Sequence, residues 1–169
     1  MGNVTGRFFG TKTAESGKIY TITRTDVVDL GLSVLWCTSN ANSPETDQKN
    51  WEGAKILANS IAGYDLPIAD NFRELTGEKT VEGVTVTKEW KGDGTGVENG
   101  YTFSTDYGSL FFPAAGYNGG NFAGSRGWYW SGESYDNSNA YILFFYGGLA
   151  YVDSNDVNLK FSVRLVRGL

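Results

Sequence analysis

Apolar and polar residues alternate near the start of the chain, in a stretch rich in β-branched residues. The alternation predicts a strand with Tyr20, Ile22 and Val27 at strand positions. Residues 29–32 (Asp-Leu-Gly-Leu) then predict a bend, because glycine allows a tight reversal of the chain. A second short strand is expected directly afterwards, over residues 34–37.

Helical spacing appears next, where apolar residues recur every three or four positions. This spacing predicts a helix that Asn50 caps at its start and that Gly63 ends. The residues expected on its inner face are Trp51, Ala54, Ile56 or Leu57, and Ile61.

A second helix is expected soon after Pro67, with Asp70 as its capping residue and Gly77 as its stop. Phe72 and Leu75 face the core in this helix. Both predicted helices fall in the first half of the chain, before a long run of predicted strands.

Short strands separated by turns are predicted for the rest of the chain. The expected strands are 83–90, 109–117, 128–132, 139–146, 149–153 and 160–166, with a flexible loop at 91–100 and a glycine-rich segment at 118–127. This order of elements predicts a single α+β domain over residues 1–169. Residues 1–18 are expected to be a flexible or strand-forming segment.

The last predicted strand has two alternating sets of residues, Phe161, Val163 and Leu165 on one face and Ser162, Arg164 and Val166 on the other. We expect this strand to return beside the N-terminal strand, so that the N- and C-terminal strands pair.

Composition and charge argue against two classes of partner, nucleic acids and membranes. The chain has 169 residues, 23 glycines, 15% aromatic residues and a net charge of −5. The negative charge and the lack of a Lys/Arg-rich run argue against a nucleic-acid partner. No apolar run approaches the roughly 20 residues of a membrane span. No signal peptide is visible after Met1. Because no apolar run is long enough to span a membrane, no membrane partner is expected.

Catalytic groups are scarce in this sequence. Histidine is absent and Cys37 is the only cysteine, so nothing of the usual kind would activate a nucleophile. We interpret Cys37 as a buried packing residue, and Ser131 also lacks a histidine partner. We therefore predict that the chain is not an enzyme and has no cofactor.

Oxygen-rich turns offer a second chemical possibility. A calcium site and ordinary turn hydrogen bonds are both compatible with such residues, and turn bonding is the commoner use. We therefore predict no metal for the two turns concerned, Asp136 with Asn137 and Asn139, and Asp153 with Asn155 and Asp156.

Five segments occur in an order that resembles a known group of proteins: VDLGLSVLW (28–36), YDLPIADNFRELTG (64–77), SLFFPAAGY (109–117), GWYWSGESYDNSNAYILFF (127–145) and FSVRLV (161–166). They resemble the C-type-lectin-fold domains of the Fibrobacter succinogenes major paralogous domain group. They also resemble the variable proteins of diversity-generating retroelements. The formylglycine-generating enzyme is a more distant relative of this fold.

The resemblance implies a C-type lectin fold in which two helices pack on short antiparallel sheets. It also implies a candidate variable region at about 117–164, where adenine mutagenesis exchanges side chains that bind a ligand. Scaffold positions implied in this part of the chain are Trp130, Ser131, Ala140, Tyr141, Leu143, Phe145, Phe161, Val163 and Arg164.

The sequence departs from these relatives in two respects. The Glu-Pro-Asn and Trp-Asn-Asp motifs of calcium-dependent animal lectins are missing, and YWSG stands where the second would be. The C-terminal catalytic cysteines of the formylglycine-generating enzyme are absent as well, because Cys37 is the only cysteine. Calcium-dependent sugar binding and that enzymatic activity are therefore not expected.

Strand alternation separates the aromatic residues of 139–146 into two faces. The resemblance places Tyr141, Leu143 and Phe145 inside, which leaves Ile142, Phe144 and Tyr146 pointing outward. A hairpin at Gly147-Gly148 is expected to bring Leu149, Tyr151 and Asp153 onto the same outer face. Replacing the three outward residues of 139–146 together with serine is therefore expected to cost on the order of 1 kcal/mol or less. The alternative, in which both faces are buried, stays open.

An exposed aromatic patch usually marks an interaction site. The candidate ligand-binding residues are Tyr117, Asn118, Asn121, Arg126, Trp128, Ser134, Tyr135, Asp136, Ile142, Phe144, Tyr146, Leu149, Tyr151 and Asp153. The expected function is binding of a protein or glycan ligand by a diversified surface on a phage tail or cell surface. The alternative is an undiversified lectin-like structural or adhesion module of a larger surface protein.

Overall fold

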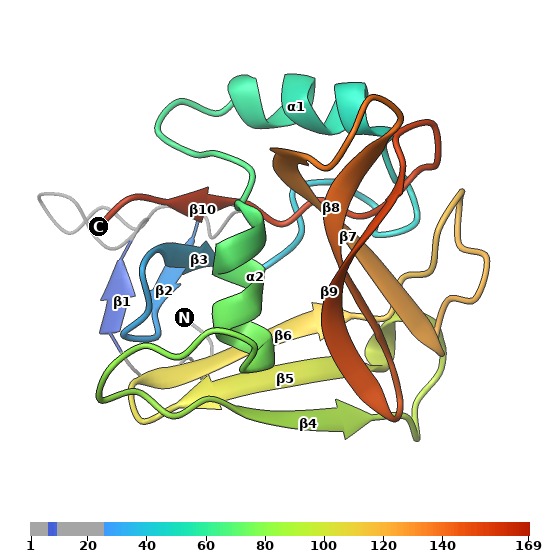
Figure 1. The fold of residues 1–169 in the computed structure, drawn as a ribbon. Helices are drawn as coiled ribbons and strands as arrows, with labels where there is room; N and C mark the ends of the chain where they lie inside the picture. Colours follow the sequence, from blue (N-terminus) through green and yellow to red (C-terminus); the bar gives the residue numbers. More distant parts are fainter. Residues whose placement is uncertain (1–6, 10–25) are drawn as a thin grey trace, which may run out of the picture.

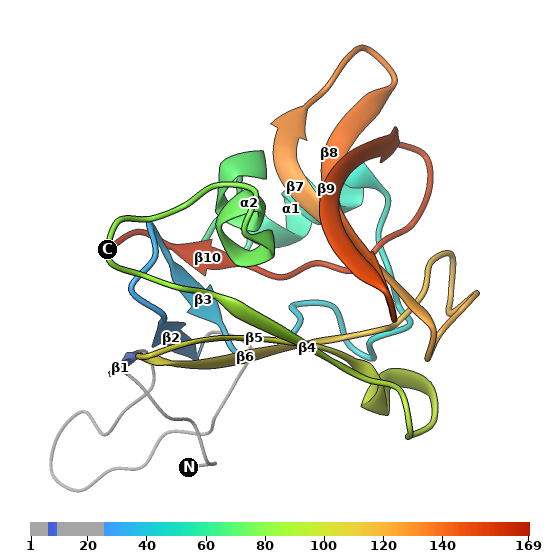
Figure 2. The same ribbon diagram turned by 60° about the horizontal axis from the view of Figure 1, so that its bottom comes forward.

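A computed structural model describes residues 7–9 and 26–169 of the chain. Over these residues it contains two α-helices and three small antiparallel sheets (Figures 1 and 2). The prediction of an α+β fold with two helices and short antiparallel sheets is confirmed.

The first sheet combines strands from both ends of the chain. It has the order β1-β2-β3-β10, with β1 Arg7–Phe9, β2 Val27–Asp29, β3 Leu35–Cys37 and β10 Val166–Arg167. The C-terminal strand thus returns to the sheet of the N-terminal strands, and its direct partner is β3. The predicted strand positions Tyr20 and Ile22 lie outside the described residues. The segment 1–18, expected to be flexible or strand-forming, is described only over β1.

The other two sheets are antiparallel meanders. The second sheet consists of β4 (Thr87–Lys91), β5 (Gly100–Thr105) and β6 (Gly108–Pro113). The third consists of β7 (Arg126–Ser134), β8 (Asn139–Tyr146) and β9 (Leu149–Asp156). Strand β5 was not predicted from the sequence, and its first residue, Gly100, is the last residue of the loop expected over 91–100. A 3-10 turn (η1, Gly96–Glu98) also lies within that range.

The prediction of a continuous strand over 160–166 is wrong. Only Val166–Arg167 is a strand, and the preceding residues make single bridges from Phe161 to Lys49 and from Ser162 to Tyr129. Both predicted faces of this segment are buried, because it runs between packed elements rather than along a surface. Its alternation therefore does not separate a core side from a solvent side.

Helix α1 (Trp51–Asn59) begins as predicted. The Asn50 side chain accepts a hydrogen bond from the backbone N–H of Gly53 at 2.8 Å. The helix ends at Asn59 with Ser60 as its cap, before the predicted stop at Gly63. Its buried residues are Ala54 and Ala58, while Ile56, one of two residues proposed for the inner face, is exposed.

Helix α2 (Ala69–Thr76) has the predicted inner face and end. Phe72 and Leu75 are fully buried, and Gly77 caps the C-terminus with a φ of 84°, a left-handed conformation that favours glycine. The ring of Phe72 lies 5.6 Å from that of Trp36 in β3. The apolar side of the helix therefore faces the core that Trp36 shares with Leu143 and Phe145, and its main strand contacts are with the third sheet.

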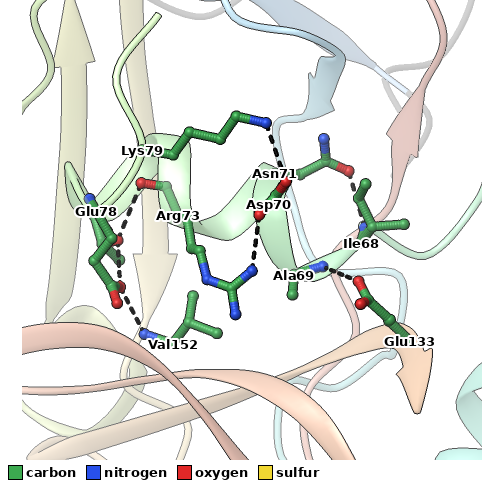
Figure 3. Close-up of polar contacts among 10 residues, drawn as sticks. Ile68, Ala69, Asp70, Asn71, Arg73, Glu78, Lys79, Glu133 and Val152 are labelled. Atoms are coloured by element: carbon green, nitrogen blue, oxygen red, sulfur yellow. Dashed lines mark hydrogen bonds and ion pairs between the residues drawn. The ribbon is translucent and has the colours of Figure 1, made fainter. Parts of the chain in front are cut away.

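The predicted cap of α2 is wrong, because Ile68 and not Asp70 precedes the helix. The Asn71 side chain instead accepts a hydrogen bond from the backbone N–H of Ile68 at 2.9 Å. Asp70 lies in the first turn, where Arg73 and Lys79 donate to it at 2.8 and 3.0 Å (Figure 3). These two cations hold the pKa of the Asp70 carboxyl below its usual range.

Polar contacts at both ends fix α2 to the third sheet, as Figure 3 shows. At its start, the backbone N–H of Ala69 donates to the Glu133 carboxylate of β7 at 3.0 Å. Just beyond its end, Glu78 accepts a hydrogen bond from the backbone N–H of Val152 in β9 at 2.8 Å. Because β9 is an edge strand, this contact also covers one of its unpaired N–H groups.

A fully buried arginine joins parts of the fold that are distant in sequence. Arg164 donates to the side-chain oxygen of Asn40 at 2.7 and 3.0 Å and to the backbone oxygen of Phe111 at 2.9 Å. Asn40 in turn donates to the Tyr129 hydroxyl at 3.1 Å, and that hydroxyl donates to the backbone oxygen of Pro113 at 2.7 Å. The C-terminal segment, β6 and β7 therefore share one buried hydrogen-bond network.

Two hydrophobic clusters lie on the two faces of the third sheet. One packs its inner face, including Tyr129, Leu143 and Phe145, with α2 and the second sheet. The other packs part of its outer face, including Trp130 and Ile142, with α1 and the C-terminal segment. The second cluster decides how much of the outer face remains available for binding.

Candidate functional site

The candidate site is the outer face of the third sheet, where residues of three strands stand opposite one another. Arg126 of β7 pairs with Tyr146 of β8, Trp128 pairs with Phe144, and Trp130 pairs with Ile142. From β8 to β9 the outward residues pair in the same way, Tyr146 with Leu149, Phe144 with Tyr151, and Ile142 with Asp153. The hairpin predicted at Gly147-Gly148 is confirmed, and so is the shared outer face.

One end of this face is core rather than surface. Ile142 is only 1% exposed and belongs to the cluster that contains Trp130, Phe161 and Ala54. The interpretation of Ile142 as an outward ligand-binding residue is therefore wrong. It points to the expected face, but α1 and the C-terminal segment cover that part of the face (Figure 1).

Two hydrogen bonds near the irregular end of β7 hold α1 and the residue before its cap against this part of the outer face. The strand register shifts between Trp130 and Ser134, so the intervening backbone groups are free to bond elsewhere. The indole N–H of Trp51 in α1 donates to the backbone oxygen of Ser131 at 2.8 Å. The indole N–H of Trp130 donates to the backbone oxygen of Lys49 at 2.7 Å.

Trp128 occupies the middle of the face and is also largely buried, at 9% exposure. Its ring centroid lies 4.9 Å from Tyr117, 5.0 Å from Phe144 and 5.9 Å from Phe161. Trp128 therefore supports the neighbouring rings and offers little surface of its own, which corrects its assignment as a displayed residue.

The opposite end of the face is open. Tyr146 is 41% exposed, Leu149 and Arg126 are exposed, and Phe144 and Tyr151 are half-buried. The Phe144 ring lies 5.9 Å from Tyr146 and 5.6 Å from Tyr151. We call the outward residues of this end, together with Tyr117 and Phe122 of the adjoining loop, the aromatic face; its members are Tyr117, Phe122, Arg126, Trp128, Phe144, Tyr146, Leu149 and Tyr151.

The loop that joins β6 to β7 extends the aromatic face at the side away from both helices (Figures 1 and 2). Phe122 is 50% exposed and adopts a φ of 64°, which is rare for a bulky residue. Its ring is nearly parallel to that of Tyr117, with centroids 6.2 Å apart, and the Arg126 guanidinium lies 4.4 Å from its centre. Strained backbone of this kind is concentrated at functional sites.

Backbone hydrogen bonds hold this loop in place. Tyr117 and Asn121 exchange two of them, at 3.0 and 2.8 Å. The Asn118 side chain accepts a hydrogen bond from the backbone N–H of Lys160 at 2.7 Å. Asn118 therefore anchors the loop, although it is exposed, whereas the exposed Asn121 side chain makes none of the hydrogen bonds seen in the described structure.

A pocket of about 270 Å³ lies between this loop, β7, the end of β9 and the C-terminal segment, and four of the eight members of the aromatic face line it. Its walls are Tyr117, Phe122, Arg126, Trp128, Asn155, Leu159 and Phe161. Three of these were expected ligand-binding residues, whereas Phe122, Asn155, Leu159 and Phe161 were not. Phe122 had one detectable signal in the sequence, because it is a lone large apolar residue within a glycine-rich segment.

Three predicted binding residues lie elsewhere. Ser134, Tyr135 and Asp136 form the turn from β7 to β8, at the opposite end of these strands from Arg126 and Tyr146 (Figure 1). Tyr135 is exposed, and its ring lies 5.3 Å from that of Tyr141. The structure therefore does not bring these residues together with the aromatic face.

The oxygen-rich turns make local hydrogen bonds. The Asp136 carboxylate accepts from the backbone N–H groups of Ser138 and Asn139, both at 2.8 Å, and these bonds help to lower its pKa. Asp153, which is exposed on β9, accepts from the adjacent N–H of Ser154 at 2.8 Å. Within residues 7–9 and 26–169, no group of three or more Cys, Asp or Glu side chains could hold a metal ion.

The side chain of Cys37 lies in the hydrophobic cluster that also contains Trp130 and Phe161. Cys37 is fully buried, and burial raises the pKa of its thiol to about 12. A thiolate nucleophile is thus disfavoured at neutral pH. The interpretation of Cys37 as a packing residue is confirmed.

No helix in the described part of the chain is long and apolar enough to cross a membrane. Neither a curated protein nor a solved structure matches the sequence. The profile of a family described as a domain of unknown function (DUF8237) matches residues 78–166, which is more than half of the chain. The match includes the second and third sheets and every wall of the pocket. The chain belongs to this DUF8237 family.

Proposed function

We propose that this chain is a ligand-binding protein that presents the aromatic face on a C-type lectin scaffold, in the manner of the variable proteins of diversity-generating retroelements. The observation that carries the proposal is a run of ring contacts from Phe122 through the buried Trp128 to Tyr151, in which the other rings are exposed or half-buried and one end of the run lines a pocket. Contiguous apolar surface of this kind usually marks an interaction site on a soluble protein. Aromatic rings suit recognition because they provide a large contact area with few rotatable bonds.

The relation between scaffold and surface supports the same proposal. Side chains on the inner face of the third sheet, such as Leu143 and Phe145, are fully buried and hold the fold. Side chains at the open end of the outer face, such as Tyr146 and Leu149, contribute little to the core. Residues there can be exchanged without loss of the fold, which is the property that a diversified binding surface requires.

A paired library tests this property. One library randomises Phe122, Arg126, Tyr146, Leu149 and Tyr151, and a control library randomises Tyr129, Leu143 and Phe145 with the same codons. We expect most members of the first library to unfold cooperatively near the parent temperature and to yield binders when selected on immobilised proteins. The control library should contain few folded members. A first library that is as poorly folded as the control, or one that yields no binders, would contradict the proposal.

The gene neighbourhood distinguishes the two forms of the proposed function. A reverse-transcriptase gene and a near-copy of codons 117–164 that differs at adenines would support a diversified binding protein. A locus without both features would contradict diversification. The chain would then be an undiversified lectin-like structural or adhesion module that binds one partner through the same face.

A further inference from the structure

We infer that the pocket in the aromatic face binds one anchor group of a protein ligand, an aromatic ring joined to or flanked by a carboxylate. This inference rests on the proposed function and specifies the chemistry that the surface recognises. It is carried by the size of the pocket, its ring-lined walls and the unpaired polar groups at its rim.

The size of the pocket limits what it can hold. Its volume of about 270 Å³ lies just below the range of about 300–1,000 Å³ for sites that enclose a whole small molecule. A single large side chain is a better match for this space than a complete ligand. Protein interfaces commonly use such pockets to seat one buried aromatic anchor.

The walls favour a ring as the apolar part of this anchor. Tyr117, Trp128 and Phe161 surround the base of the pocket, with ring centroids 4.9 to 6.4 Å apart. Phe122 forms an exposed wall beside Arg126, and Leu159 completes the apolar lining. An inserted ring can meet these neighbours edge-to-face or offset-stacked, the two arrangements that aromatic pairs prefer.

The polar groups of the pocket are donors. Arg126 makes no ion pair with any residue of the described structure, and its guanidinium lies over the Phe122 ring at 4.4 Å. The Asn155 side-chain oxygen already accepts a hydrogen bond from the backbone N–H of Asp156 at 2.8 Å, which leaves its NH₂ group to donate. None of the described residues that line the pocket carries a carboxylate. The rim is therefore complementary to an anion.

A carboxylate fits this rim better than a phosphate. Arginine binds a carboxylate through two parallel N–H···O bonds, so a single arginine can satisfy it. Phosphate groups on proteins are usually recognised by clusters of arginines. The expected anchor is thus a tyrosine or phenylalanine next to an acidic side chain or at a C-terminus.

Small probes can test this chemistry on the full chain. Phenylacetate, phenylacetamide and phenethylamine share a ring and differ in charge, and phenyl phosphate adds the competing anion. Binding is followed by NMR through the indole N–H resonance of Trp128. We expect phenylacetate to bind about tenfold more tightly than phenylacetamide, as one charged hydrogen-bonded contact allows. Phenethylamine should bind most weakly of the three.

Two matched arginine variants test whether Arg126 causes the preference for phenylacetate over phenylacetamide. Arg126→Gln should remove the preference for phenylacetate and keep the weaker binding of phenylacetamide. Arg167→Gln should change neither, since Arg167 lies 5.9 Å from the Tyr64 ring, outside the pocket walls. Retained thermal stability in both variants would show that the fold is intact.

Each other outcome overturns the inference in a recognisable way. Equal binding of phenylacetate and phenylacetamide would exclude the carboxylate, and tighter binding of phenyl phosphate than of phenylacetate would assign the site to phosphate. No binding of any probe would exclude a ring pocket. In all three cases the library selection described above still decides whether the aromatic face binds a ligand, so the two failures can be told apart.

Discussion

The two faces of the third sheet carry the same kinds of large apolar and aromatic residue, but the two faces differ in how much of each is buried. On the inner face, Tyr129, Leu143 and Phe145 are sealed by α2 and the second sheet. On the outer face, Trp130 and Ile142 are sealed in the same way by α1 and the C-terminal segment, while Tyr146 and Leu149 remain exposed. The contrast shows that the outer face changes from core to surface along its length.

This change has a physical cause in how much of each face is covered. Alternation along a strand decides which side chains share a face. It does not decide how far another element reaches across that face. Here the indole hydrogen bonds of Trp51 and Trp130 fix the cover over one end of the outer face, and within the described part of the chain no comparable cover reaches Tyr146.

The largest expected effect concerns the buried network that supports the inner face. Asn40→Ala removes the side-chain oxygen that accepts two hydrogen bonds from Arg164, and leaves a buried charge poorly satisfied. We expect the free energy of unfolding to fall by about 3–5 kcal/mol, measured by urea denaturation. Asn121→Ala, at an exposed site of the binding loop, serves as the control and should change it by about 0.5 kcal/mol or less. Similar small losses in both would refute the structural role of the network.

The next effect concerns the loop that supports the aromatic face. Gly116 has a φ of 70°, and a Cβ there would lie 2.0 Å from the backbone oxygen of Asn121. Gly116→Ala should therefore cost about 3 kcal/mol or more, through backbone strain and a clash that displaces Phe122. Gly119 has a φ of 87° with nothing within 4 Å of its Cβ position, so Gly119→Ala should cost only about 1–2 kcal/mol. Thermal or urea unfolding measures both losses. If the two variants lost the same free energy of unfolding, the close approach of Asn121 to Gly116 would not contribute to stability.

Alkaline pH should also weaken the scaffold. Burial raises the pKa of the Cys37 thiol from 9.0, and that of the Tyr129 hydroxyl from 10.0, to about 12 in each case. The unfolded chain loses these protons at lower pH than the folded chain, so stability is complete below the unfolded pKa values and falls up to about pH 12. Each group should lower the free energy of unfolding by about 1.4 kcal/mol per pH unit within its window.

Urea titrations across this range would measure the alkaline loss. Cys37→Ala should reduce the slope with pH, because only the Tyr129 contribution of the pair remains. Stability that is constant from pH 9 to 12 would contradict the burial of both groups. Asn121→Ala, which removes no titratable group, offers a control and should leave the slope unchanged.

Several features of the fold and site were predictable because their causes are local. The Asn50 cap, the left-handed Gly77 and the Gly147-Gly148 hairpin each depend on a few neighbouring residues. The shared outer face of Phe144 and Tyr151 follows from the hairpin register. Local patterns therefore defined which side chains stand together on the third sheet.

The errors concern contacts between distant segments. Ile142 appeared outward because nothing near it in sequence reveals that α1 and the C-terminal segment cover it. Asp70 is a plausible cap by residue type, but the side chains of Asn71 and the distant Glu133 satisfy the start of α2. The pocket was missed for the same reason, since Leu159 and Phe161 reach it from the C-terminal segment.

The most direct test compares two outward residues of one strand, and one of the two has the smallest expected effect. Tyr146→Ala and Ile142→Ala both truncate outward residues of β8, and urea denaturation of the two variants compares their contributions to stability. We predict a loss of about 1 kcal/mol or less for Tyr146→Ala. For Ile142→Ala we predict about 2–5 kcal/mol, because the truncation leaves a cavity in the core. Losses of equal size, whether both large or both small, would contradict the division of this face into a core end and a binding end.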